Sequence, residues 1–396
     1  MGNMKREQVP VKQYSVYGNG MAICTFLTII SQLPQLVDMG LSSNISRIVW
    51  ISFFAIVLLT QKGRIELPTM GLVFMGGYIF FILTASAVMG RSYYATSLFS
   101  SIVLSFFIFV IGLGIGKEIT EKDLLRCAKT YVIASTILAL VLYFTIYDTY
   151  DISSAVYGYG SKNSAGVILF TALLIAFVYG WREKARLNNL INLAIILLML
   201  FMVLIMKVRA MIVCIPVVAI VAVIKAPFKR SIRLPIILLC IGVLILLQID
   251  AVYDLLINDI LFASRGEDIA SASSGRIEQW SAFLDNMQGR ELLGDGKTGQ
   301  ESLILTAFLQ CGIPMGIAIV WYALWPLRKV LHWGVQRKDS HVFLLLLVAL
   351  VYFIDAIFEQ LAPFGPGARC FYLWLLFGIM VSKNRLDQNR SFSKAL

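Results

Sequence analysis

Long apolar segments recur along almost the whole chain. Of its 396 residues, 59% are hydrophobic and only 14% are charged. A run of about 20 apolar residues can cross the hydrocarbon layer of a bilayer, and about twelve runs approach or exceed that length. Inside lipid such runs must be helical, because a helix satisfies its own backbone groups. We therefore predict an all-α, polytopic membrane protein with spans near 17–37, 45–60, 68–89, 95–115, 125–147, 164–181, 188–206, 208–224, 232–249, 301–327, 341–361 and 368–382.

The basic residues predict how these spans are oriented. If both termini are cytoplasmic, most of the 34 Lys and Arg fall in the short loops on the cytoplasmic side, as the positive-inside rule requires. The net charge of +11 is therefore mainly a topological signal. It does not indicate nucleic-acid binding, because the basic residues are scattered over many loops and form no single patch.

One polar segment, 250–300, interrupts the apolar pattern and is expected to fold on the outer face. It divides the chain into spans 1–9 (1–249), the outer loop (250–300), and spans 10–12 with the cytoplasmic tail (301–396). Positions 275–287 have helical spacing, and such a short amphipathic helix either lies on the membrane surface or packs onto the bundle. Its apolar face would carry Ile277, Trp280, Leu284 and Met287, and the turns after it Gly294, Gly296 and Gly299.

Several outer-face cations have two interpretations. Lys207 and Arg209 separate two apolar runs so closely that only a tight turn fits between them. They either snorkel to the interface, or Arg209 projects into a hydrated cavity and binds an anion. Arg276 is either solvated or, together with Arg209, Lys162 and Arg265, part of a phosphate or pyrophosphate site, since guanidinium groups match phosphate oxygens.

Other residues limit the chemistry. Both histidines, His332 and His341, fall on the cytoplasmic side of this topology, so an outer-face reaction would lack a histidine base. No P-loop, HExxH or GxSxG pattern occurs, and the six cysteines show no CxxC spacing that would indicate zinc or a disulfide framework. Asp355 and Glu359 lie deep in a span, where carboxylates are either functional or, here, paired with Arg369.

Three short patterns occur in a defined order: GYGSKNSAG at 158–166, MKVRAM at 206–211, and GRIEQWSAFLDNM followed by LLGDGKTG. With about twelve spans and a large outer loop, they resemble the O-antigen polymerase and O-antigen ligase superfamily of bacterial polysaccharide assembly, over roughly residues 150–330. The resemblance implies a GT-C-like membrane fold. It matches Asn163, Arg209, Arg276 and Trp280 to family positions.

One departure from the family is informative. Members often carry a His-Asn pair about eleven residues before a Gly in helix ten, whereas counting back from Gly312 gives Glu301 and Ser302. Because the family histidine is linked to acceptor activation in ligases, this chain is more similar to a polymerase. Glu301 then either replaces the histidine, as base or hydrogen-bond acceptor, or caps the helix.

The resemblance implies a metal-independent, cofactor-free glycosyltransferase of the bacterial inner membrane. It would polymerise undecaprenyl-pyrophosphate-linked oligosaccharides at the periplasmic face, among membrane lipids, with a chain-length regulator as a candidate partner and no nucleic acid. The expected catalytic residues are Arg209, Arg276 and Glu301. Assisting or substrate-binding roles would fall to Lys162, Asn163, Arg265, Trp280, Tyr159 and Glu278, with Glu278 or Asp295 as less favoured bases.

Three alternatives stay open. The aromatic residues Tyr159 and Trp280 either stack on sugars or belong to an interfacial aromatic belt. The enzyme could instead be a ligase that moves glycans to lipid A core. The chain could also be a transporter of lipid-linked oligosaccharide or of a small solute. Transporters usually place polar residues along several spans, whereas here they gather in the outer loops.

Overall fold

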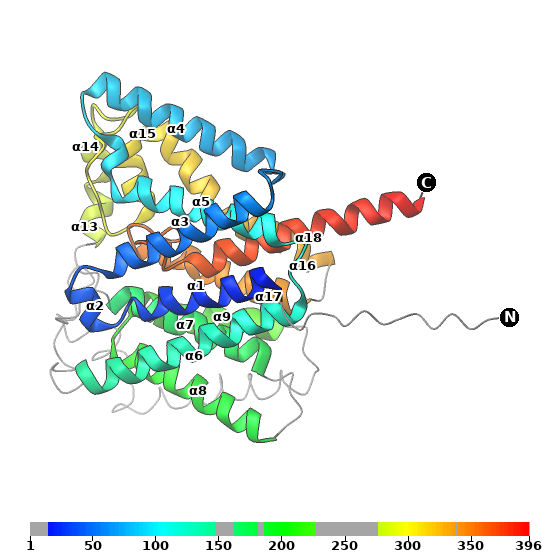
Figure 1. Cartoon of the computed structure of the whole chain (residues 1–396). Helices are drawn as coiled ribbons and strands as arrows, with labels where there is room; N and C mark the ends of the chain where they lie inside the picture. The colour runs from blue at the N-terminus through cyan, green and yellow to red at the C-terminus, as the bar shows by residue number, and fades with distance from the viewer. Residues whose placement is uncertain (1–14, 147–161, 181–185, 226–275, 337–338, 396) are drawn as a thin grey trace.

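The computed structural model describes residues 15–146, 162–180, 186–225, 276–336 and 339–395 (Figure 1). These residues form helices joined by turns, without a strand. The helices are α1 (Val16–Ile30), α2 (Pro34–Asp38), α3 (Ser42–Thr60), α4 (Thr69–Met89), the 3-10 turn η1 (Tyr93–Ala95), α5 (Ser97–Ile115), α6 (Glu121–Ile146), α7 (Lys162–Tyr179), α8 (Arg186–Ile205), α9 (Arg209–Lys225), α13 (Arg276–Ser281), α14 (Phe283–Met287), α15 (Leu303–Ala323), α16 (Trp325–Gln336), α17 (Ser340–Phe358) and α18 (Phe371–Ala395).

The all-helical prediction is confirmed for the described residues. Eight stretches among them are long and apolar enough to cross a membrane: α3 to α8, α15 continued by α16, and α17. Three shorter apolar helices are α1, α9 and the first part of α18. The expected span at 232–249 lies outside the described residues, so the total of twelve spans stays a prediction.

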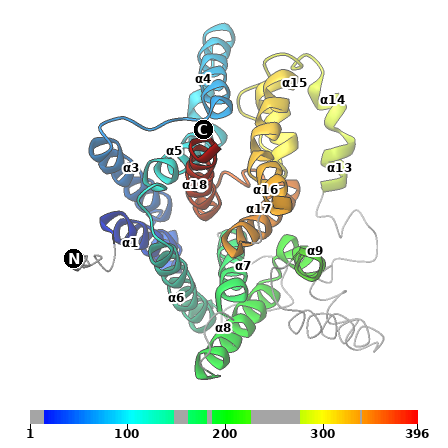
Figure 2. The same ribbon diagram turned by 90° about the vertical axis from the view of Figure 1, so that its right-hand side faces the viewer.

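The helices run between two ends of the bundle (Figures 1 and 2). We call one the terminal end, because α1 begins there and α18 extends away from it (right in Figure 1). There Gln61 donates hydrogen bonds to Tyr17 and Glu118. The other is the loop end, where α17 finishes and α13 and α14 lie (left in Figure 1).

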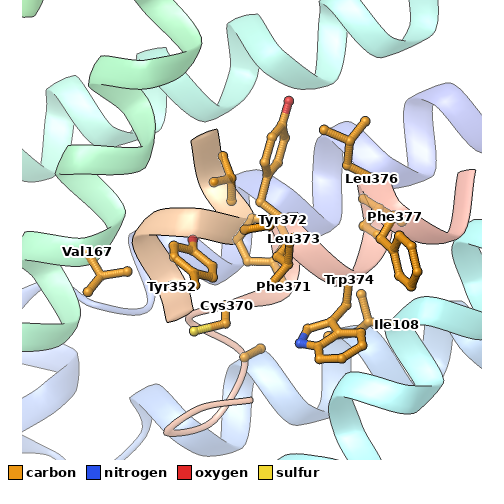
Figure 3. Close-up of a cluster of buried hydrophobic side chains, with 14 of the residues drawn as sticks. Ile108, Val167, Tyr352, Cys370, Phe371, Tyr372, Leu373, Trp374, Leu376 and Phe377 are labelled. Carbon is orange, nitrogen blue, oxygen red and sulfur yellow. The ribbon is translucent and has the colours of Figure 1, made fainter. Parts of the chain in front are cut away.

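The first turns of α18 form the centre of the bundle. Figure 3 shows Phe371 to Phe377 packed among Ile108 of α5, Val167 of α7 and Tyr352 of α17. Where α5 and α18 cross, a Cβ on Gly112 would collide with the Leu375 carbonyl, and a Cβ on Gly378 with that of Phe109. Backbone contact of this kind needs small residues, as is common between membrane helices.

Helix α15 is broken in its middle. Gly312 has φ 73°, a left-handed value that favours glycine. Pro314 has no N–H to donate to the Gln310 carbonyl, and the Ile313 N–H turns away from the helix to the Glu291 carbonyl, at 2.7 Å. The break therefore leaves two carbonyls, of Leu309 and Gln310, without their helical partners.

The glycine-rich loop after α14 supplies hydrogen-bond donors to these two carbonyls. Asp295 N–H donates to the Leu309 carbonyl at 2.9 Å, and Gly296 N–H donates to the Gln310 carbonyl at 3.1 Å. Gly294 has φ 68° and lies so close to α15 that a Cβ there would collide with the Gln310 backbone. The turns predicted at these glycines are present, and they fasten the loop to α15.

Two predicted helices are divided in the structure. The run at 17–37 is α1 followed by α2, because α1 ends at Ile30 and Pro34 begins a new helix. The amphipathic helix expected at 275–287 is α13 and α14, separated at Ala282. Its Met287 is buried, but Ile277, Trp280 and Leu284 remain exposed. Phe283 packs edge-on against Phe308 of α15 instead.

Candidate active site

Charged residues gather where α17 ends, at the loop end of the bundle. Arg369 Nη2 lies 2.9 Å from Asp355 Oδ2, and both side chains are 1% exposed. Arg369 Nη1 lies 3.8 Å from Glu359 Oε2. The pairing of these carboxylates with Arg369, one of two interpretations from the sequence, is confirmed. Buried charges require such partners because desolvation of an unpaired ion is very costly.

The first turn of α7 joins this cluster. Asn163 Nδ2 donates to Glu359 Oε1 at 2.6 Å, and Arg369 Nη1 donates to Ser164 Oγ at 3.5 Å. Asn163, expected to bind substrate, is therefore held by Glu359 in this structure. The two residues are 196 positions apart in the chain, so no local pattern could have indicated the contact.

Arg276 and Glu301, two of the expected catalytic residues, lie side by side at the rim of the cluster. Arg276 Nη2 is 3.0 Å from Glu301 Oε2, and the side chains are 23% and 54% exposed. The same Nη2 donates to the Phe358 carbonyl at 3.2 Å. The guanidinium carbon lies 6.0 Å from the centre of the Phe358 ring. The buried Nε of Arg276 has no hydrogen-bond partner, which leaves one donor of the fork unused.

Glu301 does not cap α15. The N-cap of that helix is Ser302, and it forms no capping hydrogen bond through its side chain. Glu301 instead turns its carboxylate to Arg276, while its backbone N–H donates to Gln279 Oε1 at 3.2 Å. The capping interpretation is therefore wrong, and the interpretation as a base or acceptor stays open.

The tight turn between α8 and α9 lies next to the start of α7. A Cβ on Gly166 would lie 2.6 Å from a methyl of Val208, and Cys214 Sγ lies 4.0 Å from the Val351 carbonyl of α17. Lys207 has φ 49° and is only 4% exposed, so it does not reach water as snorkelling would require. Arg209 begins α9 and is half-buried.

The N-termini of α7 and α9 thus share one region, with Lys162 as the first residue of α7 and Arg209 as the first of α9. A helix N-terminus carries a partial positive charge, and it attracts anions. The region also contains the charged cluster at the end of α17. Three segments therefore contribute cations to one end of the bundle: Lys162, Arg209 and Arg369.

Asp295 is a poor base in this arrangement. It is 3% exposed and its carboxylate accepts from the backbone N–H groups of Lys297 and Thr298, both at 2.9 Å, and from the Thr298 hydroxyl. Arg290 Nη1 lies 3.0 Å away. Burial alone would raise the pKa of Asp295, but these hydrogen bonds and Arg290 outweigh it, so the pKa lies below its ordinary value.

The remaining expected residues divide into two groups. Glu278 and Trp280 are exposed on α13, near Arg276 in sequence but without a contact to the cluster among the described residues. Tyr159 and Arg265 lie outside the described residues. Both histidines are remote, since His341 lies in the first turn of α17 and bonds the Tyr179 hydroxyl at 2.5 Å, while His332 is on α16.

Sequence reasoning left Arg369 and Ser164 out of the expected site. Arg369 follows two prolines in the turn before α18, and among the described residues it is the only arginine that is buried. A charged residue inside an apolar run is a usable signal for such a position. Among the described residues, no group of three His, Cys, Asp or Glu lies close enough to hold a metal ion.

No protein-family model matches the chain, and no curated protein matches it. The site is therefore interpreted from its own geometry: a buried Asp355–Arg369 pair, Asn163 held by Glu359, and the Arg276–Glu301 pair at the rim.

Proposed function

We propose that the protein is a glycosyltransferase that polymerises lipid-pyrophosphate-linked oligosaccharides at the loop end of the bundle. This end would face the periplasm of a bacterial inner membrane, with both termini in the cytoplasm. The observation that carries the proposal is the Arg276–Glu301 pair, 3.0 Å apart at the rim of a buried charge cluster. It combines a guanidinium and a carboxylate, the two groups that this transfer needs.

Arg276 would bind the pyrophosphate. In the reaction the bond between the sugar C1 and the phosphate oxygen breaks, and the pyrophosphate leaves with the bonding electrons. A positioned cation in a partly dry site stabilises this developing charge. Arg276 is suited to the task because its side chain is 23% exposed and its ion-pair partner Glu301 is 54% exposed. Arg209 and Lys162, at the first residues of α9 and α7, would assist.

Glu301 would activate the acceptor. The acceptor hydroxyl forms the new bond to C1 and gives its proton to a base. In this structure the Glu301 carboxylate forms an ion pair with Arg276. A solvent-exposed ion pair contributes only about 0.2–1 kcal/mol, so a pyrophosphate can displace the carboxylate from Arg276 at small cost. The displaced Glu301 then accepts the proton, and donor binding prepares the base.

The buried part of the cluster would position these groups. Arg369 connects Asp355 and Glu359 of α17 with Ser164 of α7. Phe358, between the two carboxylates, accepts from Arg276 through its carbonyl. The orientation of Arg276 therefore depends on the end of α17, which the Arg369 contacts hold in place.

The test uses the purified chain in detergent with a chemically defined undecaprenyl-pyrophosphate oligosaccharide, in the presence of EDTA and without ATP. A ladder of products with repeat-unit spacing supports a metal-independent polymerase. The matched control is Arg64→Ala, which removes an exposed arginine near the terminal end and should leave the ladder intact. No ladder with several repeat structures, combined with flux of the lipid in proteoliposomes, would replace the proposal with a transporter.

A further inference from the structure

A cavity opens between α6, α7 and α8 near the terminal end of the bundle, where these three helices lie together (Figure 2). Its volume is about 650 Å³, within the range of roughly 300–1,000 Å³ that is usual for small-molecule sites. Two of its wall residues, Ile133 of α6 and Ile191 of α8, are 58% and 52% exposed. The cavity therefore opens to the outside of the bundle, on a side that would face lipid.

Three cations of α6 line this cavity: Lys122, Arg126 and Lys129. Their positions i, i+4 and i+7 place them along one stripe of the helix. Among the described residues of the lining there is no carboxylate. Such a lining attracts an anion and offers no partner to the ammonium group of a zwitterionic lipid.

The two carboxylates in the same turn of α6 are directed elsewhere. Asp123 is fully buried, and it accepts from the Ser15 N–H at 3.2 Å and from the Thr120 N–H and hydroxyl at 3.0 and 2.7 Å. Glu121 Oε1 lies 4.0 Å from His341 Nε2 of α17. Neither carboxylate is part of the lining. Among the described residues, the mouth of the cavity therefore has a net positive charge.

The lining changes from polar to apolar with depth. On α6 the cations are followed by Ile133. On α7 the polar residue is Tyr179 and the deeper one is Ile175, and on α8 the lining runs from Asn188 to Ile195. From the first cation to Ile133 a straight helix rises about 16 Å. The lining therefore extends from the head-group layer into the hydrocarbon, which is about 15 Å thick in each leaflet.

A contact between α7 and α8 closes the floor of the cavity. Asn192 is a polar residue deeper on α8, but its Nδ2 donates to the Ala176 carbonyl of α7 at 3.1 Å. A Cβ on Gly180 would collide with the same Asn192 amide, so glycine permits this close approach. Since the amide is engaged by the backbone, the deep part of the cavity offers mainly apolar groups to a ligand.

We propose that this cavity binds an anionic phospholipid of the surrounding membrane leaflet. The phosphate would lie among Lys122, Arg126 and Lys129, and an acyl chain would lie along the isoleucines of α6 and α8. Basic pockets between membrane helices bind acidic head groups in this way. A soluble anion would leave the apolar walls uncovered. The inference does not depend on the proposed reaction, because the charged cluster lies at the opposite end of the bundle.

Direct lipid binding tests the proposal. The purified full chain in detergent is titrated with dioleoylphosphatidylglycerol, and each bound lipid is resolved by native mass spectrometry. The control is dioleoylphosphatidylcholine, which has the same chains and no net charge. We expect the anionic lipid to bind at least about tenfold more tightly, because each nearby basic residue raises the affinity several-fold. Equal affinities of the two lipids, or equally effective competition by the free head group glycerophosphoglycerol, would overturn the assignment.

Charge variants locate the binding. Lys122→Gln combined with Lys129→Gln should weaken binding of the anionic lipid about 30-fold, and both residues are exposed, so folding should not be disturbed. Arg126 is left in place because it also bonds α1. The matched control is Lys62→Gln combined with Arg64→Gln, which removes the same charge from two exposed residues outside the cavity. Equal losses in the two double variants would indicate a general attraction to basic residues and would overturn the site.

A change of volume tests the apolar half of the cavity. Ile191→Trp enlarges an exposed side chain in the wall and should weaken binding about tenfold, because it displaces part of the acyl chain. The matched control is Leu190→Trp, at a neighbouring position of α8 that is 58% exposed and does not line the cavity. Binding should change little in this control. Normal binding by Ile191→Trp, or equal weakening by both variants, would show that the lipid does not occupy this cavity.

Discussion

Two ion pairs lie at the same end of the bundle and differ in their access to water. In the Asp355–Arg369 pair both side chains are 1% exposed, and Arg369 also reaches Glu359 and Ser164. In the Arg276–Glu301 pair the side chains are 23% and 54% exposed. The same chemical groups therefore occur in one setting where they must stay paired and in another where a ligand can separate them.

This difference assigns separate roles to the two pairs. Removing one partner of a buried pair leaves a charge that neither water nor protein compensates, so the interior pair should determine whether the loop end folds. The rim pair contributes little to stability, since water screens it. Its residues should instead affect turnover. Replacing members of each pair therefore tests whether the two pairs differ in this way.

The largest effect is expected for Asp355→Ala. The change leaves the Arg369 guanidinium buried, with Glu359, at 3.8 Å, as its remaining carboxylate partner among the described residues. We expect a loss of about 3–5 kcal/mol in stability, measured as a lower melting temperature in detergent. The double replacement Asp355→Leu with Arg369→Met should be less damaging than Asp355→Ala, because it leaves no unpaired charge. A normal melting temperature for Asp355→Ala would contradict the structural role.

Arg276→Ala should leave the fold intact and remove most product. Loss of one preorganised donor to the leaving pyrophosphate costs about 10²–10³ in rate, and Arg209→Ala should act in the same direction. Arg276→Lys should rescue poorly, because an ammonium does not form a bidentate fork. The measurement is ladder formation beside a melting curve. Wild-type chain lengths in both alanine variants would disprove the pyrophosphate site.

Glu301→Gln tests the base separately from the cation. The amide keeps the size and one acceptor oxygen but cannot take up a proton, so the rate should fall by about 10²-fold. The melting temperature should stay near that of the wild type. Rates are best compared at saturating donor, so that weaker binding does not obscure the chemical step. A rate equal to the wild type would leave Glu301 without a catalytic role.

The smallest effect concerns the stability of the rim pair itself. A double-mutant cycle with Arg276→Ala and Glu301→Ala should give a coupling energy of no more than about 1 kcal/mol. Salt should reduce it further, because the pair is accessible to counterions. Comparable cycles on Asp355 and Arg369 should show larger coupling that salt hardly changes. Equal couplings for the two pairs would remove the distinction between them.

Much of the helical framework could be predicted from local patterns. The predicted runs at 45–60, 68–89 and 341–361 correspond to α3, α4 and α17 within a few residues. Apolar length suffices there, because a helix satisfies its own hydrogen bonds regardless of its neighbours. The break inside α15 could not be predicted from local patterns. Gly312 and Pro314 are compatible with an intact or a kinked helix, and the loop that bonds the freed carbonyls decides between them.

The contacts within the candidate site could not be predicted from local patterns either. Arg276 and Glu301 were both selected from the sequence, yet nothing in it indicated that they form a pair. Asn163 was selected without its partner Glu359, and Arg369 was mentioned only as a partner for carboxylates. The positions of charged residues among apolar ones are visible in a sequence. Which of them meet depends on contacts between segments, from 14 positions apart for Asp355 and Arg369 to 196 for Asn163 and Glu359.

The sequence alone predicts that the described residues are helical, that their helices are long and apolar enough for a membrane, and which cations and carboxylates stand out against that background. These properties follow from residue type and spacing, which act within one helix. Only the tertiary structure decided which carboxylate is buried and which is exposed. Burial depends on how α7, α15, α17 and α18 pack at the loop end, and access to water determines whether an ion pair holds the fold or binds a ligand.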